Sequence, residues 1–209
     1  NSGKIDGIHH IDPPLRLSLI PYLSSYVNQE ANGYGSSFFG GMDVKYGINE
    51  AFTLDVTLVP DFGQVIFDNQ VLNTSPFEIQ FNENRQFFTE GMELFNKSGI
   101  FYSRRIGVQA PREVLITNLK ENEVIGGIQG MPQLYNASKL SGRTKHGLGI
   151  GVFNALSAPT IGTAFNTITN ETREFLAAPL TNYNTLVLDQ NLKNNSSVTL
   201  TNTNVLREG

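Results

Sequence analysis

The segment between Glu83 and Arg105 holds the residues best suited to chemistry. Three carboxylates, Glu83, Glu90 and Glu93, precede Tyr102 and a pair of arginines. Glycoside hydrolysis uses two carboxyl groups held about 5 to 10 Å apart. The i, i+3 spacing of Glu90 and Glu93 brings two side chains to one side of a helical turn. Glu90 and Glu93 are therefore the catalytic candidates, and one hypothesis is a surface hydrolase with its site in residues 83–105.

Arginines in the same segment favour a structural role for these carboxylates. Guanidinium groups and carboxylates satisfy each other wherever polar groups are buried, so we expect the glutamates to be paired with arginines. The arginines also suit an anionic or sugar ligand, because a tyrosine ring can stack on the ligand while a guanidinium bridges to its acidic group. The candidate ligand-binding residues are Arg85, Tyr102, Arg104 and Arg105. A network that anchors the loop is the alternative for them.

Composition excludes several classes of site and partner. The 209-residue chain has no cysteine, which excludes a disulfide framework, a thiolate nucleophile and a cysteine-ligated metal. Ser103 lacks a G-x-S-x-G context, and no H-E-x-x-H or EF-hand pattern occurs, so we expect no metal and no cofactor. The net charge is −4 without a cluster of Lys and Arg, which argues against nucleic acid as a partner.

The elements that must position this segment show a period of two. Side chains alternate between the two faces of a strand. In residues 52–58, one face carries Phe52, Leu54, Val56 and Leu58, and the other carries Thr53, Asp55 and Thr57. The preceding residues 38–47 alternate in the same way, and the intervening Gly and Asn favour a tight turn. The pattern predicts a hairpin with one apolar and one polar face.

Seven strands follow from this alternation. They span residues 15–27, 38–47, 52–62, 134–144, 148–156, 182–190 and 196–206. The first is roughly 43 Å long at about 3.3 Å per residue, which is long for a globular strand and suits a strand tilted across a bilayer. The apolar runs fall far short of the ~20 residues of a transmembrane helix.

The predicted connections alternate in length. Those after strands one, three and five span roughly 10, 70 and 25 residues, and those after strands two, four and six are only a few residues long, as in outer-membrane barrels with short periplasmic turns and long outer loops. Residues 157–181 are expected to form a polar loop. Residues 64–131 are expected to form an extracellular or lumen-folded insertion, because they carry many aromatic side chains.

Loop sorting and strand length favour an all-β, antiparallel, up-and-down transmembrane β-barrel in the bacterial outer membrane. An apolar face toward lipid would turn the polar face toward a lumen. The predicted lumen-facing charges are Asp43, Lys45, Asp55, Lys139 and Arg143. Seven strands leave two open edges, which cannot face lipid, so we expect an incomplete barrel that needs the remainder of its own barrel. A soluble β-sandwich adhesin is a further alternative.

Short pieces of the chain resemble a known family. They are PPLRL at 13–17, YGIN at 46–49, PDFGQV at 60–65, FFTEG at 87–91, FYSRRIG at 101–107, KLSGRT at 139–144 and PLTNY at 179–183. In this order they resemble Bacteroidota envelope proteins in which a family-9-like carbohydrate-binding domain precedes a C-terminal outer-membrane β-barrel domain of unknown function. One departure is Gln86, where that family has proline. The resemblance implies that residues 15–209 are the first part of the barrel domain and residues 1–14 a linker.

These observations give one functional expectation. We favour a non-enzymatic binding, transport or assembly component of the envelope, with a relation to glycans that follows from the resemblance alone. The expected partners are outer-membrane lipid, the remainder of the barrel, other envelope proteins in a larger complex, and glycan.

Overall fold

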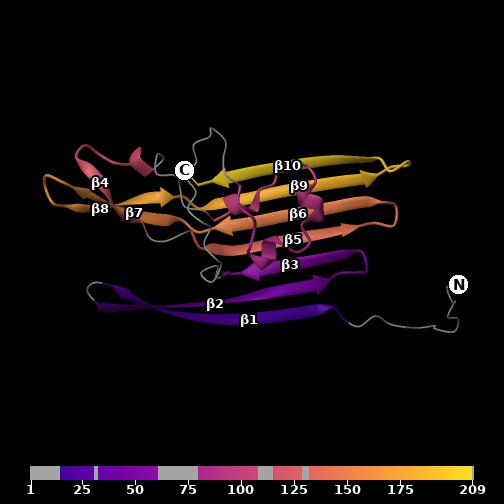
Figure 1. Ribbon diagram of the computed structural model, residues 1–209, viewed down its shortest axis with the longest axis horizontal. Helices are drawn as coiled ribbons and strands as arrows, with labels where there is room; N and C mark the ends of the chain where they lie inside the picture. The colour runs from indigo at the N-terminus through magenta and orange to yellow at the C-terminus, as the bar shows by residue number, and fades with distance from the viewer. Residues whose placement is uncertain (1–14, 31–32, 61–79, 108–114, 129–131, 209) are drawn as a thin grey trace.

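The computed structural model describes residues 15–30, 33–60, 80–107, 115–128 and 132–208. They form two antiparallel sheets, of seven strands and of three, together with short helical turns (Figure 1). The predicted linker 1–14 lies outside the described residues, as do residues 64–79, 108–114 and 129–131 of the predicted insertion. Among the described residues, no helix is both long and apolar enough to span a membrane.

The large sheet contains the seven strands that the alternation predicts. They are β1 (Leu17–Glu30), β2 (Gly33–Gly47), β3 (Phe52–Leu58), β5 (Leu134–Arg143), β6 (Leu148–Ser157), β9 (Thr181–Asn191) and β10 (Ser197–Arg207). Each strand pairs with its neighbour in the order β1-β2-β3-β5-β6-β9-β10. The all-β, antiparallel prediction is confirmed at this level. The sheet does not close into a barrel, and β1 and β10 lie at its two edges.

The predicted long connection after the first strand is wrong. The ladder continues up to the pair formed by Glu30 and Gly33, so β1 and β2 form one long hairpin rather than two strands joined by a loop over residues 28–37. A ladder uses backbone N–H and C=O groups, which polar and glycine residues supply as well as apolar ones. The sorting of connections by length therefore holds less strictly than the sequence suggests.

The small sheet replaces the predicted loop over residues 157–181. Strands β7 (Thr160–Asn166) and β8 (Thr172–Ala178) pair as a hairpin, and β4 (Glu123–Ile128) pairs with β7. In Figure 1, β7 and β8 lie beyond the ends of β6 and β9. Pro159 and Pro179 stand between the two sets of strands, and proline cannot donate to a ladder. Ala164, Phe175 and Ala177 form the core of this sheet with Leu115.

The two faces of the large sheet differ in what they carry. One, the covered face, buries Lys139, Phe153 and Asp189. The other, the open face, exposes apolar side chains that alternate with these along the strands, among them Val152 and Leu186. The charged side chains Lys139 and Asp189 are thus more deeply buried than the apolar side chains of the open face.

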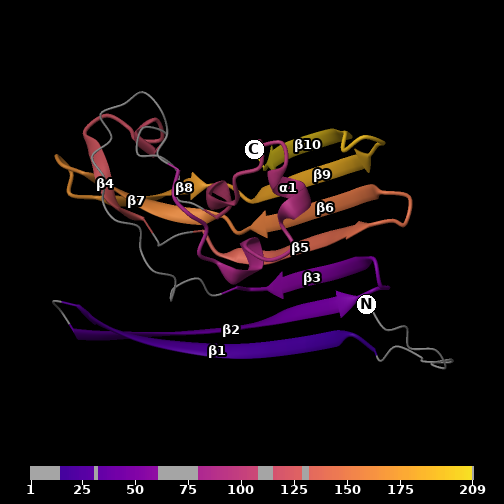
Figure 2. The ribbon, with the colours of Figure 1, turned by 45° about the vertical axis from the view of Figure 1, so that its right-hand side comes forward.

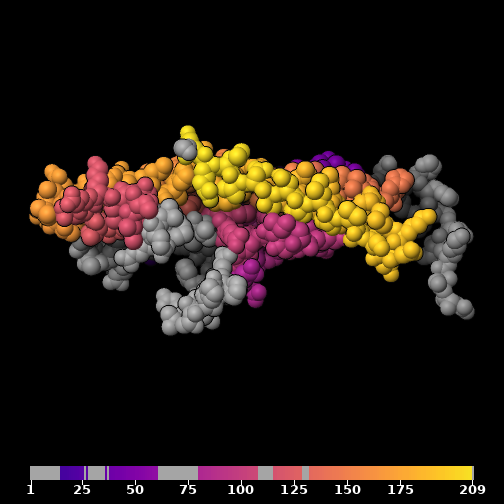
Figure 3. Space-filling view, turned by 90° about the horizontal axis from the view of Figure 1, so that it is seen from above, coloured from indigo at the N-terminus to yellow at the C-terminus, as the bar shows by residue number. Residues whose placement is uncertain are grey.

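Residues 80–107, the covering segment, lie on the covered face. They contain three single turns: η1 (Gln86–Phe88), α1 (Glu93–Asn96) and η2 (Ser103–Arg105). Figure 2 shows these turns over β5, β6 and β9, and Figure 3 shows them to one side of the sheet. Their buried side chains join those of β5, β6 and β9 in one core. Gln86, the departure from the resembling family, is the first residue of η1.

Candidate functional site

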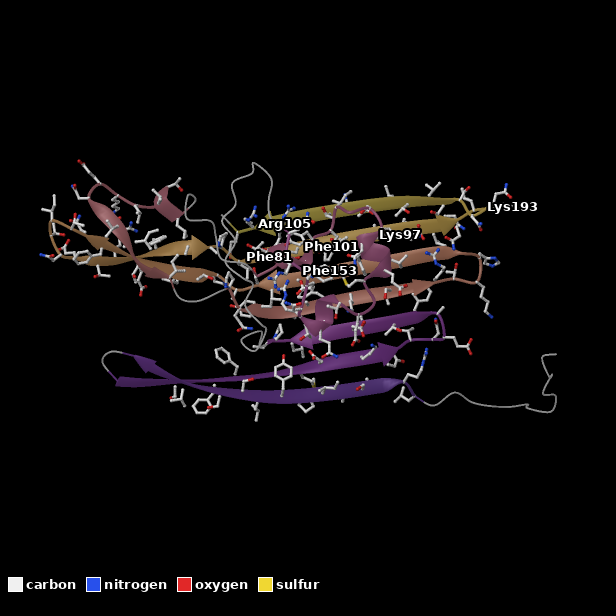
Figure 4. The ribbon with its side chains drawn as sticks, in the orientation of Figure 1. Phe81, Lys97, Phe101, Arg105, Phe153 and Lys193 are labelled. Carbon is white, nitrogen blue, oxygen red and sulfur yellow. The ribbon has the colours of Figure 1, made fainter. Side chains whose placement is uncertain are left out.

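An aromatic cluster holds the covering segment on the sheet. Phe153 points from β6 into the segment, and Figure 4 shows it beside Phe101. The ring centroid of Phe153 lies 5.2 Å from that of Phe101, 6.0 Å from that of Phe88 and 6.2 Å from that of Phe95. Offset and edge-to-face pairs at such distances are favourable beyond their buried area. Phe153 is therefore the centre of the contact.

Lys139 is an almost completely buried charge beneath the segment. Its side chain is 1% exposed, and its ammonium donates to the backbone carbonyls of Phe87 and Glu90. The ammonium also lies 3.7 Å from the carboxylate of Asp55 and 4.5 Å from the centroid of the Phe87 ring. A buried ammonium requires such donors and counter-charges. The lysine thus fastens the first turn of the segment to β5.

Asp189 on β9 organises a second ion cluster. Its carboxylate is fully buried and accepts hydrogen bonds from Lys97 at 2.7 Å, from Thr199 at 2.7 Å and from Arg143. Lys97 follows α1, Arg143 ends β5 and Thr199 is on β10. Sequence reasoning missed Asp189 and Lys97. The available signal was a lone carboxylate at a position of β9 that shares a face with Val187.

A third cluster lies within the covering segment. Arg85 donates to both carboxylate oxygens of Glu83, at 2.8 and 2.7 Å, and to the carbonyls of Ile106 and Ser103. The hydroxyl of Ser103 donates to Glu83 at 2.6 Å. The arginine is buried and its guanidinium lies 4.2 Å from the centroid of the Phe88 ring. Arg85 therefore joins the two ends of the covering segment. Its ion pair with Glu83 confirms the expected pairing of glutamate with arginine.

The two catalytic candidates differ in their surroundings. Glu90 is ion-paired with Lys45 of β2 at 2.9 Å and accepts a hydrogen bond from Gln86. Glu93 is exposed and is the first residue of α1. The partner of Glu90 is a lysine on the sheet, which the sequence did not single out for it.

The five charges predicted to face a lumen share one face of the sheet. Asp43 pairs in register with Thr57, Lys45 with Asp55, and Asp55 with Lys139. Arg143 comes four residues after Lys139 in β5. Side chains alternate along a strand, so an even separation places both on the same face. All five lie on the covered face. The assignment of that face to a barrel lumen stays a prediction.

A cleft of about 650 Å³ opens between the covering segment and the last two strands. Its lining includes Tyr102, Arg105, Tyr183, Thr185, Thr203 and Arg207. The guanidinium of Arg105 lies 5.5 Å from the centroid of the Tyr102 ring, whose hydroxyl accepts the backbone N–H of Phe81 at 2.9 Å. Of the four predicted ligand-binding residues, the structure brings Tyr102 and Arg105 to this cleft. Arg85 and Arg104 are not among its lining residues.

Acid is expected to loosen the covering segment through Glu83. Burial raises the pKa of Glu83. The hydrogen bonds from Arg85 and Ser103 lower it by more than burial raises it, so the pKa lies below its ordinary value of 4.5. As the pH is lowered through about 4.5, the unfolded chain therefore takes up a proton at Glu83 before the folded chain does. The free energy of unfolding decreases as the pH decreases. The thermal midpoint by circular dichroism should fall more between about pH 6 and pH 3 in the wild type than in Glu83→Gln. The exposed Glu208→Gln control should follow the wild type, and parallel curves for all three proteins would contradict the role of Glu83.

Comparison with known proteins gives a family and nothing more specific. No curated protein and no solved structure matches the chain. The family described as Domain of unknown function (DUF5916) matches residues 13–209, which include every described strand and the covering segment. The chain therefore belongs to the family described as Domain of unknown function (DUF5916).

Proposed function

We propose that the chain forms part of the wall of an outer-membrane β-barrel, with the covering segment on its lumenal face. In this role it serves as a non-enzymatic binding, transport or assembly component of the bacterial envelope. One observation carries the proposal: the open face is apolar and exposed, while the covered face buries charges. Barrel strands in a membrane alternate in this sense, apolar outward and polar inward.

The open face is too apolar for a surface in water. Leu19 is 55% exposed, Val152 42% and Leu200 61%, and they come from both edges and the centre of the sheet. Soluble monomers rarely expose a contiguous apolar area of this kind. Lys139 and Asp189, by contrast, are almost completely buried on the other face. Contact of the open face with lipid accounts for both observations.

A single cross-strand row on the open face supports a tilted arrangement. The row consists of Leu19, Val44, Val56, Ser138, Asn154, Asn184 and Asn204, each paired in register with the next. It is apolar on β1, β2 and β3 and polar on β5, β6, β9 and β10. The amides at its polar end hydrogen-bond to one another, with Asn154 donating to Asn184 at 2.8 Å and Asn184 to Asn204 at 3.1 Å.

Strand tilt explains why one row changes character. Strands in membrane barrels tilt by about 35–45° and lie about 4.8 Å apart, so a row across seven strands changes depth by about 16 to 20 Å. The apolar band of such a barrel is only about 25 Å tall. The row therefore starts within the lipid at Leu19 and leaves it toward Asn204. The small sheet β4-β7-β8 lies beyond the C-terminal end of β6 and the N-terminal end of β9 (Figure 1). We place this sheet outside the membrane.

The partners of this wall follow from its two edges. Strands β1 and β10 are edge strands of the described sheet, and an open edge cannot face lipid. We propose that further strands of the same barrel pair with them. Other envelope proteins and glycan are proposed partners on the basis of the resemblance to Bacteroidota envelope proteins.

The alternatives receive less support from the contacts. A hydrolase in residues 83–105 would need carboxylates placed for proton transfer, whereas Glu83 is bound by Arg85 and Ser103 and Glu90 by Lys45. A soluble sandwich adhesin would turn its charged face to water and bury its apolar face. Here the charged face carries the covering segment.

Tryptophan fluorescence tests the lipid contact: these 209 residues contain no tryptophan, and the signal of each introduced tryptophan is taken as the difference from the wild-type protein in the same vesicles. In full-length protein refolded into vesicles with brominated acyl chains, a tryptophan at Val152→Trp should be quenched strongly, since Val152 lies on the open face. A tryptophan at Lys193→Trp should be quenched little, because Lys193 lies in the turn beyond β9 and β10 (Figure 4). Equal quenching at both positions, or none at Val152→Trp, would refute the barrel.

A further inference from the structure

Charged side chains are absent from the open face over the five strands β3, β5, β6, β9 and β10. In the cross-strand register of these strands, the odd-numbered residues share the covered face with Asp55. Every charged residue of the five strands has an odd number: Asp55, Lys139, Arg143, Asp189 and Arg207. The polar side chains on the open face of these strands are therefore uncharged, and this part of the face can bind a polar partner only without ion pairs.

Five amide side chains meet on the open face and form the asparagine cluster, which consists of Asn154 on β6, Asn182 and Asn184 on β9, and Asn202 and Asn204 on β10. Asn154 donates to Asn182 at 2.7 Å and to Asn184 at 2.8 Å. Asn184 donates to Asn182 at 2.9 Å and to Asn204 at 3.1 Å, and Asn204 donates to Asn202 at 3.3 Å. One hydrogen-bonded network thus fixes the amides of three strands side by side.

The network leaves hydrogen-bonding groups for a partner. Asn182 and Asn202 take part in it only as acceptors, so their side-chain N–H groups have no acceptor among the described residues. Asn182 is half-buried and Asn202 is exposed. A carboxamide has two N–H donors and one acceptor oxygen, and a hydroxyl group can both accept from it and donate to it. The cluster therefore suits a partner that carries several hydroxyls.

Apolar side chains border the asparagine cluster on both sides along the strands. Leu186 pairs in register with Asn202 and is 41% exposed, and Leu206 pairs with Asn182 and is 63% exposed. The small sheet, which we place outside the membrane, follows at the same end of β6 and β9 (Figure 1). Amides among exposed leucines at the end of an apolar surface fit the depth at which the polar headgroups of a bilayer meet its hydrocarbon core.

We propose that the asparagine cluster binds the headgroup of a membrane lipid that carries sugar hydroxyls and no charge. The N–H groups of Asn182 and Asn202 donate to hydroxyl oxygens of the headgroup, and an acyl chain lies against Leu186. A charged headgroup would find no counter-charge on this part of the face, whereas hydroxyls match the amides in both directions. The inference rests on the membrane location proposed above and adds to it the class of lipid that this wall selects.

Competition between lipids in vesicles tests the assignment with the full-length protein. Leu186→Trp places a reporter beside the cluster, and Leu19→Trp places one on β1, at the other edge of the sheet. Brominated phosphatidylcholine quenches each tryptophan, and unbrominated digalactosyl diacylglycerol with acyl chains of the same length competes with it. We expect the galactolipid to bind about three- to tenfold more tightly than phosphatidylcholine beside Leu186→Trp, the effect of one net hydrogen bond. Beside Leu19→Trp the two lipids should bind equally.

Asparagine variants separate the cluster from a general effect of the galactolipid. The combined Asn182→Leu and Asn202→Leu substitutions, added to Leu186→Trp, should abolish the preference, because leucine has no donor. Asn96→Leu is the matched control: it makes the same change at an exposed position that ends α1, and it should keep the preference.

Several results would overturn the proposal: no preference at Leu186→Trp, an equal preference at both reporters, or a preference that survives in the combined asparagine variant. Anionic phosphatidylglycerol that competes as well as the galactolipid would overturn the assignment to an uncharged sugar headgroup. A complete lack of quenching by the brominated lipid at both reporters would refute the membrane location itself, so the failures of the two proposals are distinguishable.

Discussion

Replacing Phe153 by alanine is expected to release the covering segment and to lower the free energy of unfolding by about 3 to 5 kcal/mol. The side chain is 1% exposed and contacts the rings of Phe88, Phe95 and Phe101. Its loss leaves a cavity at the centre of the contact between segment and sheet, and such a site collapses poorly when several rigid rings surround it. Urea unfolding in detergent measures the loss, and tryptic cleavage after Lys97 measures the release.

Val152→Ala is the matched control, because it shortens the neighbouring side chain on the opposite face of β6. Val152 is 42% exposed, so its truncation removes less buried area and should cost under about 1.5 kcal/mol. Cleavage after Lys97 should stay as slow as in the wild type. If Phe153→Ala were cleaved no faster than Val152→Ala, the aromatic cluster would not be what holds the segment.

Lys139→Met is expected to destabilise the protein by about 3 to 5 kcal/mol, although methionine matches the length of the lysine side chain. The substitution leaves the carboxylate of Asp55 without its nearest cation, and the carbonyls of Phe87 and Glu90 lose the donor they share. Unsatisfied buried acceptors and an unpaired buried charge are among the costliest defects in a folded protein. The same urea titration measures the effect.

Lys45→Met provides the comparison on the same face. The Lys45–Glu90 pair has side chains 53% and 50% exposed, and an ion pair of that exposure contributes at most about 1 kcal/mol. Adding Asp55→Asn to Lys139→Met should recover part of the lost stability, because it removes the unpaired charge. A loss in Lys139→Met no larger than that in Lys45→Met would show that burial of Lys139 is unimportant.

The large sheet could be predicted because its two faces meet different surroundings. Wherever one face is apolar and the other polar, side chains repeat with a period of two, and this period located all seven strands. Phe52, Leu54, Val56 and Leu58 show it most clearly. The ends were less accurate: the predicted third strand reached residue 62, whereas β3 ends at Leu58.

The small sheet could not be found in this way. In β7, the buried positions are filled by Thr160, Gly162 and Ala164, so small and polar residues take the places where large apolar ones would mark a face. Pro159 and Pro179 next to these strands also favour a loop in a local interpretation. The pairing of β7 with both β4 and β8 supplies the stability that local preference lacks.

The candidate site was predictable in kind but not in its partners. The mixture of glutamate and arginine in residues 83–105 indicated an ion-paired segment, and Glu83 with Arg85 fulfils that expectation. The partners of Glu90 and Lys97 lie on β2 and β9, many residues away in sequence. Such pairs depend on how the segment lies across the sheet, which no local pattern specifies. The cleft could not be predicted for the same reason, because it forms between the covering segment and the last two strands, which include Arg207.

The strand order has a consequence for how the chain reaches this fold. Every strand of the large sheet pairs with the next one in that sheet along the chain, and β6 and β9 are brought together by the β7–β8 hairpin between them. Pairing of this kind keeps contacts local and the entropy of loop closure small. The joining of β3 to β5 is the exception, because it must enclose residues 59–133. The aromatic cluster contains residues of β5, β6 and β9, so the covering segment cannot complete its contacts before these strands have paired.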